Sequence, residues 1–408
     1  MHEASPVSRR SARLSLIFSA LGHGYMHLFA AFYFVIVLAL EADWGLPYHE
    51  LVELWTLGAL LIGLVAVPAG WLGDRWSTTG MMIVFFLGMG LAGIVCGLVD
   101  GPTAMMLGLA AIGVFAAIYH PVGIPWVVKN ATAKGKALGI NGIFGAVGIA
   151  GAGIVAGTLI DLASWRAAFI VPGIVSVVTG LALLACRLLG WIEEPRVEKA
   201  SEEAHGRGDM LRAFTILLVT MFMMGLVFQA TQAALPKVFD LRLRDLAGEG
   251  AFGIGAIVAA VYTVGGVMQV LGGHMADRLP LKAVYLGAFL LQVPILALLA
   301  ALGGVPLIVV AMVTVLLSTG ALPAENMMLA RYTPDRHRSL AFGVKFVLAF
   351  GAAPVAMQIV GFIQGRTGEF VWLFLFLALC AGIAALAAAI LPGGLRGSAP
   401  QESVQPAE

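Results

Sequence analysis

Histidines in a segment almost free of charge are the first residues in this chain that can do chemistry. His23 and His27 lie four positions apart in the stretch SALGHGYMHLFAAF, and a later stretch, YHP, places His120 beside Tyr119. Residues i and i+4 of a helix share a face, with Cβ atoms about 6 Å apart. Histidine titrates near working pH and also ligates metals. The pair can therefore carry protons, form half of a metal site, or pack as hydrogen-bonded core side chains.

Two opposite charges lie inside apolar runs near the C-terminus. Glu325 precedes Arg331 by six residues, and Lys345 follows Ser339 by six, which places each about 9 Å inside a helix end at about 1.5 Å per residue. Ionisable side chains within a membrane are costly and are usually paired or functional. We expect either a Glu325–Lys345 ion pair, or a Lys345 side chain that extends to the membrane surface while Arg331 holds Glu325.

Uncharged amides supply a second kind of polar group. Gln229 and Gln232 are three positions apart and share a helix face, whereas Asn326 and Gln358 lie in later apolar runs. Such amides can orient a polar solute, or they can bond to a neighbouring helix as a packing device. Both interpretations stay open for all four residues.

The composition shows what must position these groups. Of the 408 residues, 60% are hydrophobic and only 12% are charged, whereas an ordinary soluble domain is about 25% charged. The chain is therefore predicted to be an integral membrane protein. Period-2 alternation typical of a barrel is absent, so we expect an all-α fold. A net charge of +1 argues against a nucleic-acid partner. The three cysteines stand alone in separate runs, so neither a disulfide framework nor a cysteine zinc site is indicated.

Twelve apolar runs reach the roughly 20 residues that a membrane-spanning helix needs. They cover residues 14–40, 52–73, 80–99, 103–128, 136–160, 166–190, 212–236, 251–275, 283–302, 306–330, 339–363 and 370–391. The first is too long for the apolar core of a signal peptide, about 7–15 residues, so we expect an uncleaved helix.

Positive charge is distributed unevenly between the two sides of the predicted membrane. The side of the termini holds 18 of the 24 Lys and Arg residues, one lies within a span, and the opposite side holds five: Arg166, Lys237, Arg242, Arg244 and Arg366. The positive-inside rule then predicts that both termini are cytoplasmic. We expect the membrane to be the inner membrane of the cell.

The sequence also repeats itself. AGWLGDRWSTTG follows the second run and GGHMADRLPLKA follows the eighth, at an offset of 203, and a second match occurs at an offset of 202. The matched residues, our predicted gating set, are Gly70, Asp74, Arg75, Gly273, Asp277, Arg278, Lys129 and Arg331. We predict four segments: an N-terminal six-helix bundle (14–190), a cytoplasmic linker (191–211), a C-terminal six-helix bundle (212–391) and a cytoplasmic tail (392–408). Such duplications are typical of transporters that rock about a central site.

The G-x-x-x-D-R pattern resembles the signature loop of the major facilitator superfamily, and SWRAAF from Ser164 opens the sixth run as in such proteins. The resemblance covers residues 14–391. It implies the major facilitator fold, with two six-helix pseudo-repeats and a central cavity lined by helices one, four, seven and ten. Asp74 is expected to help close the cytoplasmic side, and Gly70 and Gly273 to allow close helix approach.

Within this superfamily the chain is similar to fosmidomycin-resistance-type efflux proteins. Those proteins carry a histidine in helix one with an acidic residue four positions on, and a His-Pro-Glu motif in helix four. Here His27 stands in the acidic position and Val122 stands in place of the glutamate. His23, His27 and His120 are then the predicted proton carriers. The glycine-rich fifth helix, from Gly142, either partly reproduces an antiporter motif or serves small-residue packing.

The predicted substrate and proton cavity comprises His23, His27, Tyr25, Tyr119, His120, Gln229, Gln232, Glu325, Asn326 and Lys345. No nucleophile elbow, phosphate-binding loop or H-E-x-x-H motif occurs, so we expect no enzyme, cofactor or resident metal. We predict a monomeric secondary transporter in the lipid bilayer that exports a small molecule by rocker-switch alternating access, with the proton as coupling ion. The alternative is a permease for a metabolite or metal ion that uses the histidine cavity.

Overall fold

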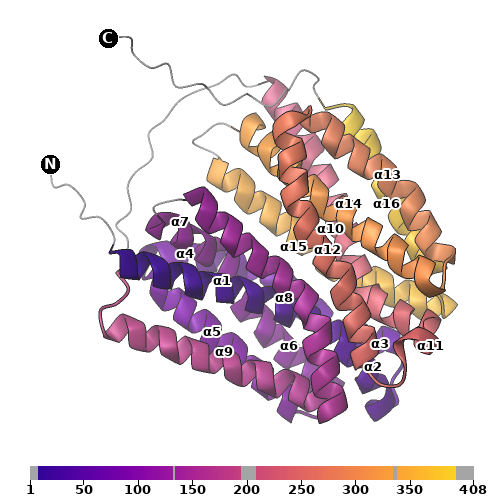
Figure 1. Ribbon diagram of the computed structural model, residues 1–408, viewed down its shortest axis with the longest axis horizontal. Coiled ribbons are helices and arrows are strands. Elements are labelled where there is room, and N and C mark those ends of the chain that lie inside the picture. Colours follow the sequence, from indigo (N-terminus) through magenta and orange to yellow (C-terminus); the bar gives the residue numbers. More distant parts are fainter. Residues whose placement is uncertain (1–7, 132–133, 194–207, 334–337, 392–408) are drawn as a thin grey trace.

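Apolar helices make up most of the chain in a computed structural model that describes residues 8–131, 134–193, 208–333 and 338–391 (Figure 1). Within these residues, twelve helical segments are long and apolar enough to cross a membrane, from Arg9–Trp44 to Val371–Ala389. The predicted number of spans and the all-α membrane fold are confirmed. Residues 194–207 of the predicted linker and the whole predicted tail, 392–408, lie outside the described residues.

The described helices fall into an N-terminal and a C-terminal half. The N-terminal half contains α1 (Arg9–Ala31), α2 (Tyr33–Trp44), α3 (Tyr48–Glu53), α4 (Trp55–Arg75), α5 (Thr78–Leu98), α6 (Pro102–Ala116), η1 (Tyr119–Gly123), α7 (Ile124–Asn130), α8 (Lys134–Leu162) and α9 (Trp165–Leu188). The C-terminal half contains α10 (Gly208–Arg242), α11 (Arg244–Ala247), α12 (Phe252–Arg278), α13 (Leu281–Ala301), α14 (Gly304–Tyr332), α15 (Arg338–Thr367) and α16 (Val371–Ala389).

The fourth predicted span is not one regular helix. Between α6 and α7 the chain forms a short π-helix, η1, which contains His120 and Pro121. Proline has no backbone N–H, and its ring crowds the preceding turn, so a regular α-helix cannot continue through it unchanged. Single π-turns inside helices are frequent at functional sites. The motif YHP therefore sits at a local irregularity that its proline favours, although α14 continues as an α-helix through Pro323.

The halves meet through helices that are far apart in sequence. α12 packs on α8, α15 packs on α3 and α4, and α10 packs on α2; Figure 1 shows the indigo-to-magenta N-terminal half beside the orange-to-yellow C-terminal half. At the α8–α12 crossing, a Cβ on Gly153 would lie 2.7 Å from the carbonyl oxygen of Gly255. Small residues let helix backbones approach this closely. At this position the glycine-rich fifth helix serves packing.

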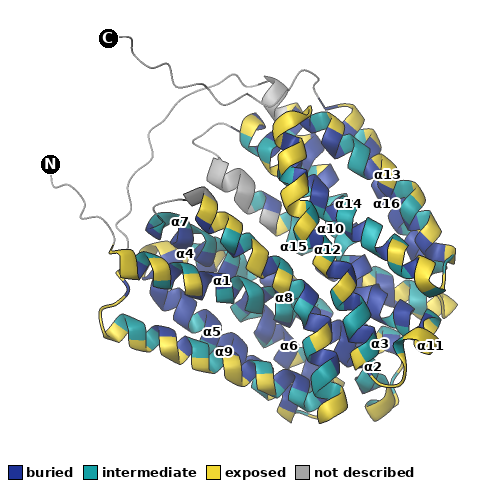
Figure 2. Cartoon of the chain, in the orientation of Figure 1, coloured by how far each residue is buried: buried dark blue, intermediate teal, exposed yellow. Residues whose placement is uncertain are grey.

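Large apolar side chains cover the outer faces of both halves. Ile174, Val178 and Leu181 on α9 and Trp372 and Leu379 on α16 are all exposed. Figure 2 shows exposed residues along the outward faces of the helices, with buried residues between them. Except at its two ends, the backbone polar groups of such a helix are satisfied within the segment, as a lipid environment requires. The protein is a multi-pass membrane protein.

Candidate functional site

Three histidines converge between α1 and η1. The rings of His23 and His27 have centroids 5.0 Å apart, and the His120 ring lies 5.5 Å from the first and 5.6 Å from the second. Each residue offers a ring nitrogen, and these nitrogens all lie within 4.8 Å of one another. All three residues are partly exposed, but both ring nitrogens of His120 are buried. The structure thus brings together the three histidines that the sequence singled out, and we call them the histidine cluster.

Hydrogen bonding orients the His23 ring. Its Nδ1 lies 2.8 Å from the backbone carbonyl oxygen of Asn141 on α8. A carbonyl oxygen can only accept, so Nδ1 carries the proton and, in the neutral ring, Nε2 holds the lone pair. The Asn141 side chain donates to Tyr119 Oη at 2.8 Å and to Ser19 Oγ at 3.1 Å. The hydrogen bond to α8 therefore holds this imidazole with Nε2 as its acceptor atom.

Aromatic rings from both halves border the cluster. Tyr119 stacks on His23 with a centroid separation of 4.9 Å and an interplanar angle of 18°. Phe350 belongs to α15 in the C-terminal half, and its ring centroid lies 5.1 Å from that of His120. The histidine cluster consequently lies at the boundary between the two halves.

Tyr25 is not part of this cluster, and that it lines the solute cavity stays a prediction. It lies two positions from each histidine of α1, which corresponds to about 200° around a helix. Its hydroxyl lies 3.2 Å from Thr179 Oγ1 on α9, and its ring packs edge-on against Phe86 on α5. The side chain therefore packs inside the N-terminal half.

A buried polar network lies among α10, α13, α14 and α15 of the C-terminal half. Lys345 Nζ lies 2.7 Å from Glu325 Oε1, and the two side chains are only 9% and 5% exposed. Lys345 also donates to Asn326 Oδ1. Tyr285 Oη donates to Glu325 Oε2 at 2.7 Å and lies 2.9 Å from Thr220 Oγ1. Of the two alternatives that the sequence left open, the structure shows the ion pair.

The other amides lie in different surroundings. Gln358 on α15 donates to Thr56 Oγ1 on α4 at 3.1 Å and so links the two halves. Gln232 on α10 is buried, and Gln229 on the same helix is partly exposed. That these two residues contact a solute stays a prediction.

The predicted gating residues of the N-terminal half contact one another within that half. Lys129 Nζ lies 3.3 Å from Asp74 Oδ1, and the Asp74 side chain is 72% exposed. A Cβ on Gly70 would lie 3.1 Å from Pro121 Cβ, so α4 closely approaches η1 there, as expected. The Asp74–Lys129 pair does not bridge the two halves in this conformation.

The repeated motif does not behave identically in the C-terminal half. A Cβ on Gly273 would meet nothing within 4 Å, whereas one on Gly272 would clash with the backbone of Gly320 on α14. The predicted close approach at Gly273 is therefore wrong, because the preceding glycine, about 100° away around the helix, faces the neighbour. The remaining charges of the gating set are exposed at helix ends: Arg75, Asp277, Arg278 and Arg331.

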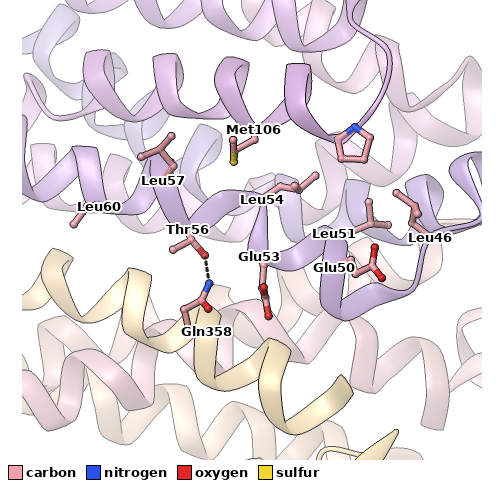
Figure 3. A pocket seen from close by; sticks show the side chains of 11 residues that line it. Leu46, Glu50, Leu51, Glu53, Leu54, Thr56, Leu57, Leu60, Met106 and Gln358 are labelled. Atoms are coloured by element: carbon pink, nitrogen blue, oxygen red, sulfur yellow. Dashed lines mark hydrogen bonds between the residues drawn. The ribbon is translucent and has the colours of Figure 1, made fainter. Parts of the chain in front are cut away.

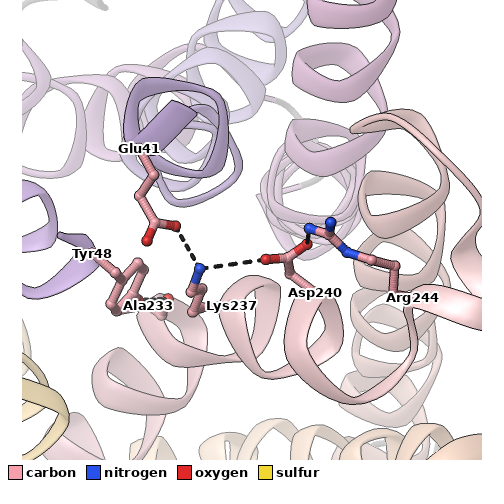
Figure 4. Close-up of polar contacts among 6 residues, drawn as sticks. All are labelled: Glu41, Tyr48, Ala233, Lys237, Asp240 and Arg244. Carbon is pink, nitrogen blue, oxygen red and sulfur yellow. Dashed lines mark hydrogen bonds and ion pairs between the residues drawn. The ribbon is translucent and has the colours of Figure 1, made fainter. Parts of the chain in front are cut away.

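A charged network joins the halves at the helix ends opposite the termini, and the sequence analysis missed it. Lys237 Nζ of α10 lies 2.6 Å from Glu41 Oε2 of α2 and 3.4 Å from Asp240 Oδ2, and Asp240 also pairs with Arg244 (Figure 4). The predicted apolar runs ended directly before Glu41 and Lys237, so both resembled ordinary charges that flank a membrane. The only available signal was that the residues following the two runs, Glu41 and Lys237, have charges of opposite sign.

Two further contacts hold the halves together at this end. Asp161 at the end of α8 accepts hydrogen bonds from the backbone N–H groups of Ala251 and Phe252, at 2.7 and 2.8 Å, where α12 begins. A carboxylate is favourable at a helix N-terminus because it pairs with unsatisfied N–H groups and the positive end of the helix dipole. Tyr48 Oη also donates to the carbonyl oxygen of Ala233 at 2.9 Å.

A pocket of about 530 Å³ lies at the junction of α3, α4, α6 and α15 (Figure 3). Leucines are the commonest residues of its wall, and Glu50, Glu53 and the hydrogen-bonded pair of Gln358 and Thr56 supply the polar groups. None of the ten predicted cavity residues lines it. The pocket and the histidine cluster are separate features.

Comparison with known families decides the class of the protein. A family model described as the Major Facilitator Superfamily matches residues 14–265 and 244–407. The chain belongs to the major facilitator superfamily. The resemblance drawn from the G-x-x-x-D-R loops is confirmed at this level, and the protein is a membrane transporter and not an enzyme.

Similarity to individual proteins covers only part of the chain or has low sequence identity. The puromycin resistance protein of Streptomyces alboniger is 33% identical over 140 residues, a match that spans 33% of this chain and 27% of that protein. A bacterial homolog of the human lysosomal transporter Spinster, in an inward-facing and unoccupied conformation, shares 15% identity with a TM-score of 0.75 over 94% of this chain and 98% of its own. The peptide transporter POT in complex with sulfate gives 15% identity and a TM-score of 0.71 over 93% of each chain. The two structures show the fold alone, and similarity to the fosmidomycin-resistance type stays a prediction.

Proposed function

We propose that this protein is a proton-coupled secondary transporter that exports a small organic solute, with His23, His27 and His120 as its proton carriers. The observation that carries the proposal is the convergence of three imidazoles at the boundary between the halves. Histidine is the side chain whose ordinary titration lies nearest working pH, and ionisable groups within spans mark proton and substrate paths. Similarity to a protein named for puromycin resistance supports an organic solute and outward transport.

The helix α15 provides the coupling between the halves. It carries Lys345, which pairs with Glu325, and five residues further on Phe350, which lies against His120. Two protonated imidazoles 5.0 Å apart repel each other. Protonation of the cluster therefore favours an arrangement in which the rings separate and become hydrated, and the contact with Phe350 transmits this change to α15.

We further propose that both termini are cytoplasmic and that the membrane is the inner membrane, from the excess of Lys and Arg on the side of the termini. With that orientation the contacts of Glu41 with Lys237 and of Asp161 with α12 close the outer side. The described conformation is then inward-facing, the state in which an exporter loads its solute. Export requires these outer contacts to break.

Solute binding by the detergent-purified protein tests the proposal before any flux is measured. Puromycin, phosphonates, hydrophobic cations, carboxylates and sugars are screened for thermal stabilisation at two pH values. A ligand at 100 times its Kd adds about 2.7 kcal/mol to the stability of the folded state. We expect an organic compound to stabilise the protein with a pH dependence that His27→Ala removes and His274→Ala keeps. Equal stabilisation at both pH values in the wild type would contradict proton coupling through the cluster.

A further inference from the structure

The histidine cluster has a second chemical capacity that does not depend on proton transport. We propose that His23, His27 and His120 together bind one divalent transition-metal ion of the zinc type through three imidazole nitrogens. Zinc sites with three protein ligands leave the fourth position to water or a substrate. The inference rests on the geometry of the cluster and goes beyond the proposed function.

The positions of the nitrogens suit such an ion. The three candidate ligand atoms lie within 4.8 Å of one another. A tetrahedral ion with Zn–N distances of about 2.0–2.1 Å needs them about 3.3 Å apart. The nitrogens are therefore at most about 1.5 Å farther apart than the ion requires. The terminal torsion angle of a histidine side chain varies widely, so ring rotation can supply much of this difference.

One ligand is already held in the state that metal binding requires. His23 donates Nδ1–H to the Asn141 carbonyl oxygen at 2.8 Å, which leaves Nε2 unprotonated in the neutral ring. Metal-binding histidines usually donate their second N–H to a carbonyl or carboxylate in this way, and the bond fixes both tautomer and ring orientation. This hydrogen bond is independent of the proximity of the three rings.

The type of donor limits the type of ion. The three-residue group that could hold an ion contains only imidazole nitrogens. Imidazole suits zinc, copper, nickel and related ions, whereas magnesium and calcium prefer oxygen ligands. The predicted site therefore takes Zn²⁺ or Co²⁺ and rejects Mg²⁺ and Ca²⁺.

Packing behind His23 supplies a test that removes no ligand. A Cβ on Gly145 would lie 2.6 Å from His23 Cε1 and 2.7 Å from Nε2, whereas a Cβ on Gly151 of the same helix would meet nothing within 4 Å. Gly145→Ala should displace the His23 ring, and Gly151→Ala should leave it in place. The two substitutions are chemically identical and lie on one helix.

The experiment is a titration of the detergent-purified full chain, free of any polyhistidine tag, with Co²⁺ alone and then with Zn²⁺ as competitor. We expect one Co²⁺ per chain with the intense visible absorption of four-coordinate cobalt, and displacement by Zn²⁺ but not by Mg²⁺. His27→Ala and His120→Ala should weaken binding by more than about 100-fold, because even changes outside the ligand shell cost about 10–100-fold. Gly145→Ala should weaken it by about tenfold or more, with His274→Ala and Gly151→Ala unchanged.

Other outcomes would overturn the site. Wild-type cobalt spectra of the pale six-coordinate kind, or binding unchanged in both His27→Ala and His120→Ala, would place the ion elsewhere. Thermal unfolding without metal shows whether each variant is folded. Because no solute or gradient is used, cobalt binding can succeed while pH-dependent solute binding fails, or the reverse, so the two proposals fail separately.

Discussion

Loss of the Lys345 charge should destabilise the protein far more than loss of an exposed charge. Lys345→Met leaves the Glu325 carboxylate in a site where its side chain is 5% exposed, with Tyr285 as its remaining described partner. Removing one partner of a buried ion pair costs about 3–5 kcal/mol because an uncompensated charge stays behind. Glu325→Gln should cost a similar amount, about 3–5 kcal/mol, because it leaves the Lys345 ammonium, whose side chain is 9% exposed, without its counter-charge.

The double variant Glu325→Gln/Lys345→Met distinguishes pairing from two independent effects. With neither charge present, we expect the free energy of unfolding to fall by less than the sum of the two single decreases. The difference should be about 2 kcal/mol, within the range measured for contacting residues. The assay is reversible unfolding in mixed detergent micelles, followed by tryptophan fluorescence. Lys129→Met is the control: its partner Asp74 is 72% exposed, so the loss should stay below about 1 kcal/mol. Additive single losses, or a Lys345→Met loss as small as that of the control, would refute the buried pair.

Three further predictions concern the contacts between helices. Gly153→Ala should lower the melting temperature because the added methyl group forces α8 away from Gly255, at a cost of about 1–3 kcal/mol for overpacking. Gly151→Ala is the control and should leave the melting temperature unchanged. Equal melting temperatures for the two variants would contradict the close crossing. Glu41→Gln should speed the reaction of a membrane-impermeant maleimide with a cysteine placed at Ala233, since Lys237 then loses its partner across the halves; an unchanged rate would show that this pair does not hold the outer side closed. Asp74→Asn should slow transport while the protein still inserts in the membrane, and full transport activity would remove Asp74 from the gating set.

The sequence was sufficient for features that depend on local periodicity. Twelve apolar runs predicted twelve spans because hydrophobic length is a property of consecutive residues. The i, i+4 spacing of His23 and His27 predicted a shared face for the same reason. The approach of His120 to them was predicted from the resemblance, whereas the π-turn at Pro121 that accompanies it is a local distortion visible only in the structure.

The direction in which a side chain points around its helix, and the residue that it contacts on another helix, could not be predicted from local periodicity. Tyr25 lies between the two histidines of α1 in sequence, but two helical positions turn it away from their face, and its hydroxyl contacts Thr179 on α9. The contact between Glu41 and Lys237 joins residues 196 positions apart, and no periodicity in either segment indicates the partner. For Glu325 and Lys345 the sequence supplied both candidate charges, but only the packing of α14 and α15 shows that they meet.

The most direct test of the central claim is solute flux driven by an imposed pH gradient in proteoliposomes. The solute is the organic compound that stabilises the purified protein, and the compared proteins are wild type, His27→Ala and His274→Ala. The account predicts that the pH gradient drives the solute against its concentration gradient in liposomes with wild type or His274→Ala. With His27→Ala the solute should only equilibrate across the membrane. Accumulation by His27→Ala that equals wild type, or wild-type flux that ignores the gradient, would contradict proton coupling through the histidine cluster.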